Sequence, residues 1–111
     1  IFCDIDGTLF HHSGDLHKQT MLKPGLLDGV KEKIVEWDRK GYNIILTTGR
    51  KEGMREVTER HLAEAGIFYD QLILGIGGGI RYLINDRKSD GRESALAICL
   101  ERDEGISGIN I

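Results

Sequence analysis

The sequence is poor in proline and cysteine and has no long hydrophobic segment. Its 111 residues include one proline and two cysteines, too few cysteines for a disulfide framework or a zinc ribbon. No apolar run approaches the roughly 20 residues that a membrane-spanning helix needs. Lys and Arg number 15 against 18 Asp and Glu, so the basic excess typical of a nonspecific nucleic-acid binder is missing. These absences predict a cytoplasmic protein with no membrane partner and no nucleic-acid partner.

The length of the chain predicts one domain over residues 1–111, because 12.4 kDa leaves no room for a second core of useful size. The sequence opens on an apolar strand, so neither a signal peptide nor a transit peptide is expected there. Glycine is the one unusual count, at 15. Low-complexity sequence is absent, so these glycines are expected to mark turns.

The hydrophobic pattern alternates between short apolar runs and segments of helical spacing. Strands are predicted at 1–5, 42–46, 72–74, 80–84 and 106–111, and helices at 27–40, 51–65 and 93–102. A polar loop or flap is predicted at about 8–23, and a tight glycine turn at 75–79. Strands that alternate with helices favour a mainly parallel sheet. The predicted fold class is therefore α/β: a three-layer α/β/α, Rossmann-like domain with a mainly parallel five-stranded sheet.

Polar side chains follow the predicted strands at the sheet edge where such folds bind ligands. Asp4 and Asp6 end the first strand, Thr48 follows the second, and Asp86 follows the fourth. Carboxylates that converge repel one another unless a cation neutralises them. Magnesium prefers oxygen ligands and commonly bridges carboxylates to a substrate phosphate. The sequence therefore predicts a magnesium site at this edge.

The run Asp-Ile-Asp-Gly-Thr at residues 4–8 resembles the nucleophile motif Asp-x-Asp-Gly-Thr of the haloacid dehalogenase superfamily. Thr48-Gly49 is similar to the second motif of that family, and Asn85-Asp86 with Asp90 four residues on is similar to the fourth. The resemblance covers nearly all of the chain. It implies one hydrolase domain that works on phosphate esters.

The resemblance also implies a role for each matching residue. Asp4 would attack the substrate phosphorus and form an aspartyl-phosphate. Asp6 would protonate the leaving oxygen and then activate the hydrolytic water. Phosphate would be bound by the hydroxyl of Thr48 and by the turn that follows it, over Gly49, Arg50 and Lys51.

The metal ligands follow from the same resemblance. Asp86 would bind magnesium beside Asp4 and the backbone carbonyl of Asp6. Asn85 or Asp90 would lie in the outer shell of that metal. For Asp90, capping of the following helix is an equally good interpretation.

The third family motif, a Lys or Arg that neutralises the nucleophile and the phosphate, has no counterpart within 75–79. Arg50 or Lys51 could replace it, whereas Arg81 is expected to point away from the site. No cap domain is inserted after the first or the third strand. An open site of this kind either accepts a large phosphorylated partner or is closed by a neighbouring subunit of a homo-oligomer. The resemblance implies a small-molecule substrate, such as a sugar phosphate or another phosphorylated metabolite.

Two alternative functions stay open at this stage. A receiver-like module also uses an Asp, a Thr and magnesium on a parallel sheet, although it does not need a general acid such as Asp6. A catalytically weak or inactive binding or assembly domain is the other alternative, because the third motif is missing. Three histidines in the flap favour substrate contact over metal binding: His11, His12 and His17.

Overall fold

A computed structural model describes residues 1–12 and 24–111 of the chain, so most of the predicted flap at 8–23 lies outside the described residues. The described part is a small α/β domain with three parallel strands, β1 (Phe2–Asp4), β2 (Ile45–Thr47) and β3 (Gln71–Ile73). The strands lie in the order β1-β2-β3. The predicted α/β class and parallel sheet are confirmed.

The register of the sheet brings three buried side chains into line. Cys3 lies opposite Leu46, and Leu46 lies opposite Leu72. All three are less than a tenth exposed. Because successive side chains of a strand point to opposite faces, the residues on either side of this line face the other way, and Asp4 therefore points away from the apolar side of β1.

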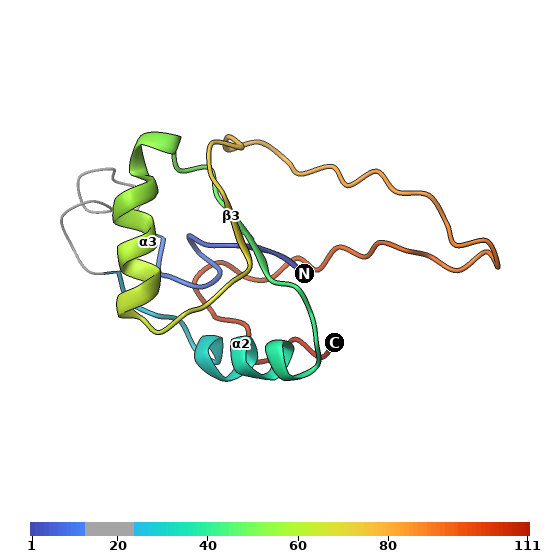
Figure 1. Cartoon of the computed structure of the whole chain (residues 1–111), viewed down its shortest axis with the longest axis horizontal. Helices are drawn as coiled ribbons and strands as arrows, with labels where there is room; N and C mark the ends of the chain where they lie inside the picture. The colour runs from blue at the N-terminus through green and yellow to red at the C-terminus, as the bar shows by residue number, and fades with distance from the viewer. Residues whose placement is uncertain (13–23) are drawn as a thin grey trace.

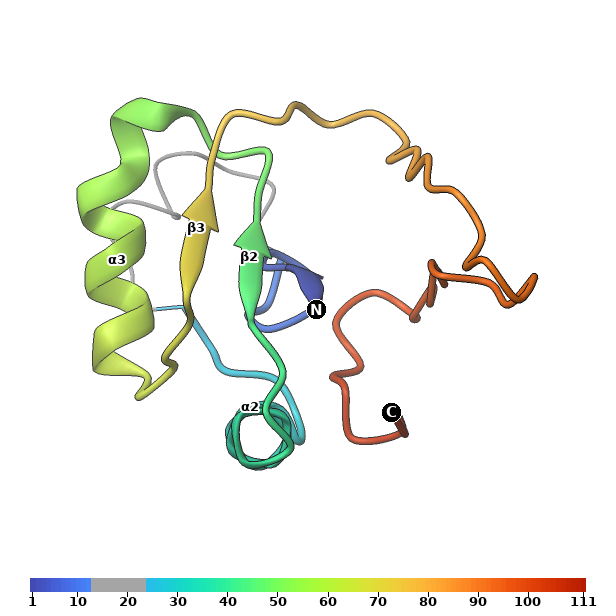
Figure 2. The same cartoon turned by 45° about the vertical axis from the view of Figure 1, so that its right-hand side comes forward.

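Two helices complete the regular structure, α2 (Val30–Arg39) and α3 (Arg55–Glu64), with a short 3-10 turn η1 (Glu52–Met54) before α3. Helix α2 buries Val30, Ile34 and Trp37, which lie four and three residues apart as a helical face requires. In Figures 1 and 2, α3 runs along β3 and α2 lies below the strands. The arrowheads of β2 and β3 in Figure 2 mark the carboxyl edge of the sheet, away from α2.

The described residues form a three-stranded sheet and do not form the predicted five strands and three layers. Among the described residues, 80–84, 93–102 and 106–111 contain no strand or helix. Instead the chain leaves the sheet after β3, runs outward as an extended arm over about 76–102 and then returns (Figures 1 and 2). Ile80 is 80% and Ile84 is 92% exposed. An apolar run becomes a strand only where it finds a neighbouring strand and a face to bury, and the arm finds neither.

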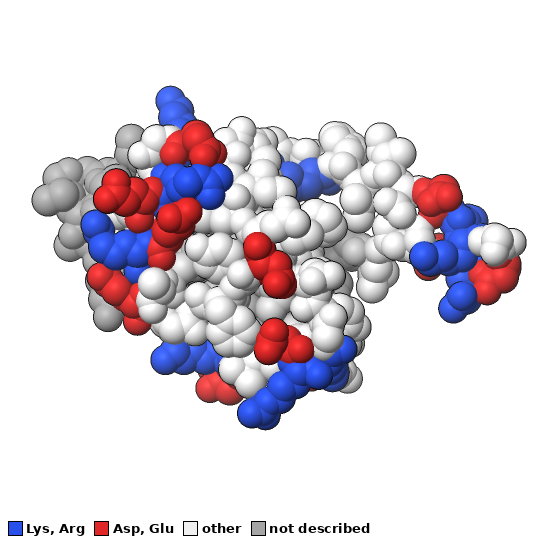
Figure 3. Space-filling view, in the orientation of Figure 1, with Lys and Arg blue, Asp and Glu red and all other residues white. Residues whose placement is uncertain are grey.

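The charged side chains are mixed in sign across the face shown in Figure 3. Blue and red groups lie side by side over α3 and again at the far end of the arm, with mostly uncharged surface between them. At the end of the arm, Arg92 pairs with Asp90 and Arg87 with Glu93. No broad surface of one sign appears on this face.

The returning chain docks against the start of α2. The backbone N–H of Ile106 donates to the carbonyl oxygen of Asp28 at 3.0 Å, and the Ile106 side chain is fully buried in the core. Gly105 has a φ of 85°, and a β-carbon there would lie 2.3 Å from the same carbonyl oxygen. The residues after the arm are therefore fixed to the domain by a close backbone contact that only glycine permits.

We expect Gly105→Ala to lower the free energy of unfolding by about 1–3 kcal/mol, because it combines a left-handed backbone with a steric clash. The matched control is Gly108→Ala in the same segment, where a β-carbon meets nothing within 4 Å. Urea unfolding of both variants measures the difference. Equal stabilities would show that 105 does not dock against Asp28.

Candidate functional site

The candidate site begins where β1 ends. Ile5 is fully buried, and its carbonyl oxygen accepts hydrogen bonds from the backbone N–H groups of Thr8, Leu9 and Phe10 at 3.2, 2.8 and 3.1 Å. This tight turn places Asp4 and Asp6 on either side of Ile5. The hydroxyl of Thr8 donates to Oδ2 of Asp4 at 3.2 Å. Residues 4–8 therefore form a compact turn that presents two carboxyl groups.

The pKa of Asp4 is raised above its ordinary value. The largest cause is desolvation by the surrounding protein, and the negative charge of Asp6 adds to it. The hydrogen bond from Thr8 and the positive charge of Arg81 act in the opposite direction. Asp4 is nevertheless exposed as a residue, so its carboxyl group is partly desolvated and still open to an incoming molecule.

The turn after β2 supplies the second half of the site. Thr48 is buried, and its backbone N–H donates to the carbonyl oxygen of Ile73 at 3.0 Å. Its hydroxyl oxygen accepts from the backbone N–H of Arg50 at 3.0 Å. A β-carbon on Gly49 would lie 2.8 Å from the carbonyl oxygen of Gly77. The glycine loop that begins the arm thus packs directly against this turn.

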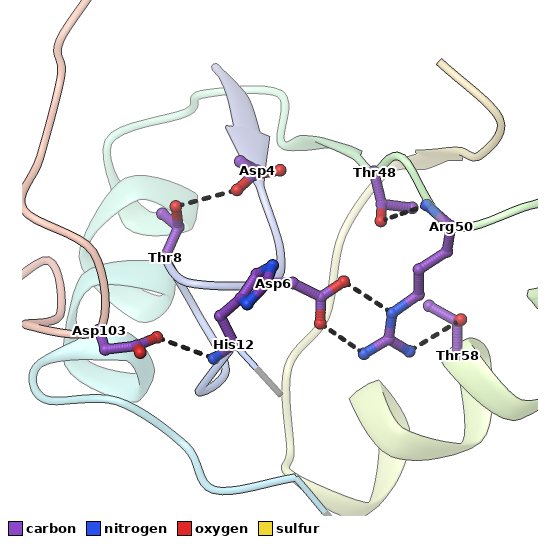
Figure 4. A network of polar contacts seen from close by, with 8 residues as sticks. All are labelled: Asp4, Asp6, Thr8, His12, Thr48, Arg50, Thr58 and Asp103. Atoms are coloured by element: carbon purple, nitrogen blue, oxygen red, sulfur yellow. Dashed lines mark hydrogen bonds and ion pairs between the residues drawn. The ribbon is translucent and has the colours of Figure 1, made fainter. Parts of the chain in front are cut away.

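The guanidinium of Arg50 joins the two halves (Figure 4). Its Nε donates to Oδ2 of Asp6 at 2.8 Å, and its Nη2 donates to Oδ1 at 2.7 Å. On the other side, Nη1 donates to the hydroxyl of Thr58 on α3 at 3.0 Å. Arg50 is only 5% exposed. The predicted part of Arg50 in phosphate binding stays a prediction, and in this arrangement each nitrogen of the guanidinium donates to a protein group.

The two other cationic residues considered from the sequence, Lys51 and Arg81, lie in different surroundings. Lys51 is exposed and precedes η1. Arg81 was expected to point away, but its guanidinium donates to the carbonyl oxygens of Gly77 and Gly79, and its charge acts on Asp4.

The predicted magnesium ligands do not come together here. Among residues 1–12 and 24–111, no three His, Cys, Asp or Glu side chains form a group that could hold a metal ion. Both oxygens of Asp6 are paired with Arg50, and Asp86 is an exposed residue of the arm. The ligand predicted on residue 6 is its backbone carbonyl, so the carboxyl pairing with Arg50 does not decide the matter; what the structure does not bring together is Asp4 and Asp86, because Asp86 lies on the arm.

The outer ligands of the predicted metal site have partners within the arm. The side-chain amide of Asn85 donates to the hydroxyl of Ser94 at 2.9 Å, and that hydroxyl donates to the backbone carbonyl of Asp86. Asp90 accepts from the backbone and side chain of Arg92 at 3.1 and 2.7 Å. The contacts of Ser94 join the two sides of the arm, whereas the Asp90 contacts are local to its end. The metal roles of these residues stay predictions.

A further polar contact lies beside the turn of residues 4–8. Oδ1 of Asp103 accepts from the backbone N–H of His12 at 2.8 Å, and Oδ2 lies 3.4 Å from Nδ1 of His11 (Figure 4 shows the first). Asp103 and Thr58 were not singled out from the sequence. The backbone partner of Asp103 lies 91 positions away, and Thr58, eight positions after Arg50, has no pattern that marks it as a partner of that residue. His17 lies outside the described residues.

Comparison with known proteins gives matches to solved structures alone. No protein-family model matches the chain, and a comparison with curated proteins also finds no match. A chain in a structure of a Pnkp1/Rnl/Hen1 complex is 35% identical, with a TM-score of 0.60, over 73% of this chain and 29% of that chain. A chain in a structure of the Pnkp1/Rnl/Hen1 RNA repair complex is 33% identical, with a TM-score of 0.58, over 80% and 27%. This chain therefore spans less than a third of those it matches.

These neighbours overturn one expectation drawn from the sequence. A small-molecule substrate, no nucleic acid and closure by a homo-oligomer were expected, yet the matched chains come from an assembly for RNA repair. The prediction relied on net charge, and net charge detects only proteins that coat nucleic acid nonspecifically. Within the described residues, no helix is long and apolar enough to span a membrane.

Proposed function

We propose that this chain is a phosphomonoester hydrolase that removes a terminal phosphate from RNA through an aspartyl-phosphate on Asp4. The observation that carries the proposal is the turn of residues 4–8. It presents an accessible carboxyl on Asp4 and a second carboxyl, two residues on, that Arg50 holds in place. The RNA substrate is taken from the solved structures that resemble the chain, since both belong to an RNA repair assembly.

The reaction has two steps. In the first, an oxygen of Asp4 attacks phosphorus, the bond from phosphorus to the ester oxygen breaks, and Asp6 gives a proton to the departing oxygen. In the second, Asp6 accepts a proton from water as that water attacks the aspartyl-phosphate. The bond between phosphorus and Asp4 then breaks, which releases inorganic phosphate and restores both carboxyl groups. The charge of Arg81 lowers the pKa of Asp4, as the smallest of the effects on it, and favours its carboxylate form.

We also propose that the activity depends on magnesium, although the two steps above are written without it. To use Asp86 as a ligand, the arm would have to fold back so that residues 80–84 extend the sheet beside β1, which lies at its edge. That movement would also give the larger sheet that the sequence predicts. The metal dependence of the activity tests this part separately.

The test measures phosphate release from oligoribonucleotides that carry a terminal phosphate at one end or at the other. A hexose phosphate is the comparison substrate. Each substrate is assayed with magnesium and with a chelator. We expect faster release from RNA, with loss of activity in the chelator. If phosphate were released from the hexose phosphate alone, the proposal of an RNA substrate would be wrong. Absence of release from every substrate would favour a binding or assembly domain, and a long-lived phosphorylated Asp4 would favour a receiver-like module.

The raised pKa of Asp4 predicts the pH dependence of this activity. Asp4 attacks only as the carboxylate, so kcat/KM falls as pH falls through the pKa of Asp4. Because desolvation raises this pKa, the fall begins at a higher pH than for an ordinary aspartate. Thr8→Ala removes the hydrogen bond that lowers the pKa and is expected to move the fall to still higher pH.

The matched control for this profile is Thr8→Ser, which keeps the hydroxyl and is expected to keep the native profile. Rates are measured over the acidic range with the substrate that the release assay identifies. If Thr8→Ala and Thr8→Ser give the same profile, the acidic limb does not report the ionisation of Asp4.

A further inference from the structure

We propose that Thr58 on α3 is a positioning residue that acts through Arg50 to fix the carboxylate of Asp6. This inference rests on the proposed function, since it assigns a supporting group to the residue that moves the proton. Thr58 touches no reacting atom. The Thr58 hydroxyl contacts the edge of the Arg50 guanidinium that points away from Asp6 (Figure 4).

The contacts of Arg50 define the orientation of its guanidinium. Nε and Nη2 donate to the two oxygens of Asp6 at 2.8 and 2.7 Å, and Nη1 donates to the Thr58 hydroxyl at 3.0 Å. A guanidinium is planar, so acceptors on two sides of it fix both its position and its rotation. The two acceptors come from the end of β1 and from α3. The plane of the Asp6 carboxylate is thus set through Arg50 by helix α3, to which Arg50 links it.

Burial makes this link specific. Thr58 is fully buried and Arg50 is 5% exposed, so water is not at hand to replace a lost acceptor. Without the Thr58 hydroxyl, an N–H of a buried charged group would lack its partner, which is costly. The guanidinium would then turn to find another acceptor and would carry the carboxylate of Asp6 with it.

Two polar side chains of α3, Thr58 and His61, lie buried in the surroundings of Arg50, and Thr58 is the one that is hydrogen bonded to it. The nearby His61 is buried, and its pKa is lowered, first by desolvation and then by the charges of Arg50 and Arg60. Nδ1 of His61 has no hydrogen-bond partner among the described residues. The hydroxyl of Thr58 is the side-chain acceptor that α3 provides for Arg50.

The arrangement still allows Asp6 to move a proton. Each carboxylate oxygen has two lone pairs, and Arg50 occupies one position on each. The second position on either oxygen can take the proton from water or hold the proton that goes to the leaving oxygen. The pair with Arg50 therefore fixes the direction of the carboxylate without closing it to proton transfer.

The test compares Thr58→Val with Thr58→Ser in the phosphate-release assay. Valine keeps the shape of threonine and removes the hydroxyl, whereas serine keeps the hydroxyl. We expect Thr58→Val to lower kcat by about 10- to 100-fold, as small displacements of catalytic groups do, and to leave KM within about twofold because Thr58 does not touch substrate. Thr58→Ser is expected to retain kcat within about threefold.

A second measurement does not depend on activity. In the native protein the Nε–H of Arg50 is buried and hydrogen bonded, so its NMR signal is expected to exchange slowly with water. Thr58→Val is expected to accelerate that exchange at least about tenfold, since the buried pair loses one anchor, and Thr58→Ser is expected to leave it unchanged. Thermal melting of both variants shows whether the fold is kept.

The outcomes separate this inference from the proposed function. Equal kcat values for the valine and serine variants, or unchanged exchange of the Arg50 Nε–H in Thr58→Val, would overturn the positioning role. A parallel rise in KM would show a general loss of structure instead and would also overturn it. If the native chain releases no phosphate, the catalytic role fails together with the proposed function, and the exchange measurement alone reports whether Thr58 holds Arg50.

Discussion

Replacing Asp4 with asparagine is expected to abolish phosphate release, with a loss of at least about a thousandfold in kcat. Asparagine has nearly the same shape as aspartate but no anionic oxygen to attack phosphorus. The substitution should also prevent any phosphorylated form of the protein from accumulating. Release of inorganic phosphate from the RNA substrate measures the rate, and intact mass after rapid quenching detects the covalent intermediate.

The matched control is Asp38→Asn, which removes an exposed carboxylate from α2. It changes net charge by the same amount, and we expect native kcat and KM. Asp6→Asn is expected to be slow as well, but its phosphorylated form should persist, because no base activates water in the second step. If Asp4→Asn retained the native rate, the attacking group would lie elsewhere and the proposed mechanism would be wrong.

Asp4→Asn is also expected to stabilise the fold at neutral pH. The pKa of Asp4 is raised in the folded protein, so the folded chain holds the proton more tightly than the unfolded chain does. At a pH above both values the ionised carboxyl opposes folding, and this cost disappears as pH falls below them. Asp4→Asn should therefore melt at a higher temperature than the native chain at neutral pH, and the difference should shrink in acid. A lower melting temperature at neutral pH would contradict the direction of the shift.

Replacing Ile106 with alanine is expected to lower the free energy of unfolding by about 2–5 kcal/mol. Ile106 is fully buried among the core residues, and its backbone is bonded to Asp28. Removing three of its carbons leaves a cavity where the returning chain meets α2. For a domain of this size the loss is a large part of the total stability, so a marked drop in the urea midpoint should be seen.

The matched control is Ile84→Ala, which removes the same carbons from the arm. Ile84 is 92% exposed, so we expect a change within about 0.5 kcal/mol in a buffer without divalent cations. The pair of variants tests the arm directly, because a fourth strand over 80–84 would bury part of this side chain. A loss for Ile84→Ala as large as that for Ile106→Ala would show that the arm packs on the sheet in solution.

The sequence alone determined the elements whose signals are local. The spacing of Val30, Ile34 and Trp37 defined α2, and short apolar runs that end in polar turns defined β1, β2 and β3. Helical spacing and strand alternation are set by the backbone geometry of a few neighbouring residues, so they can be read without the rest of the molecule. The same reasoning located Asp4, Asp6 and Thr48 at strand ends, because parallel strands carry their ligand-binding residues there.

Only the tertiary structure decided the matters that depend on a distant partner. The run 80–84 has the composition of a strand, but whether it pairs depends on which edge its backbone reaches, and the chain instead carries it outward on the arm. The sequence did not reveal the partner of Arg50 either, because Asp6 lies 44 positions away along the chain. A guanidinium can pair with a carboxylate, a hydroxyl or a phosphate with similar geometry. Its choice of Asp6 and Thr58 is fixed by the packing that brings β1, the turn after β2 and α3 to one point.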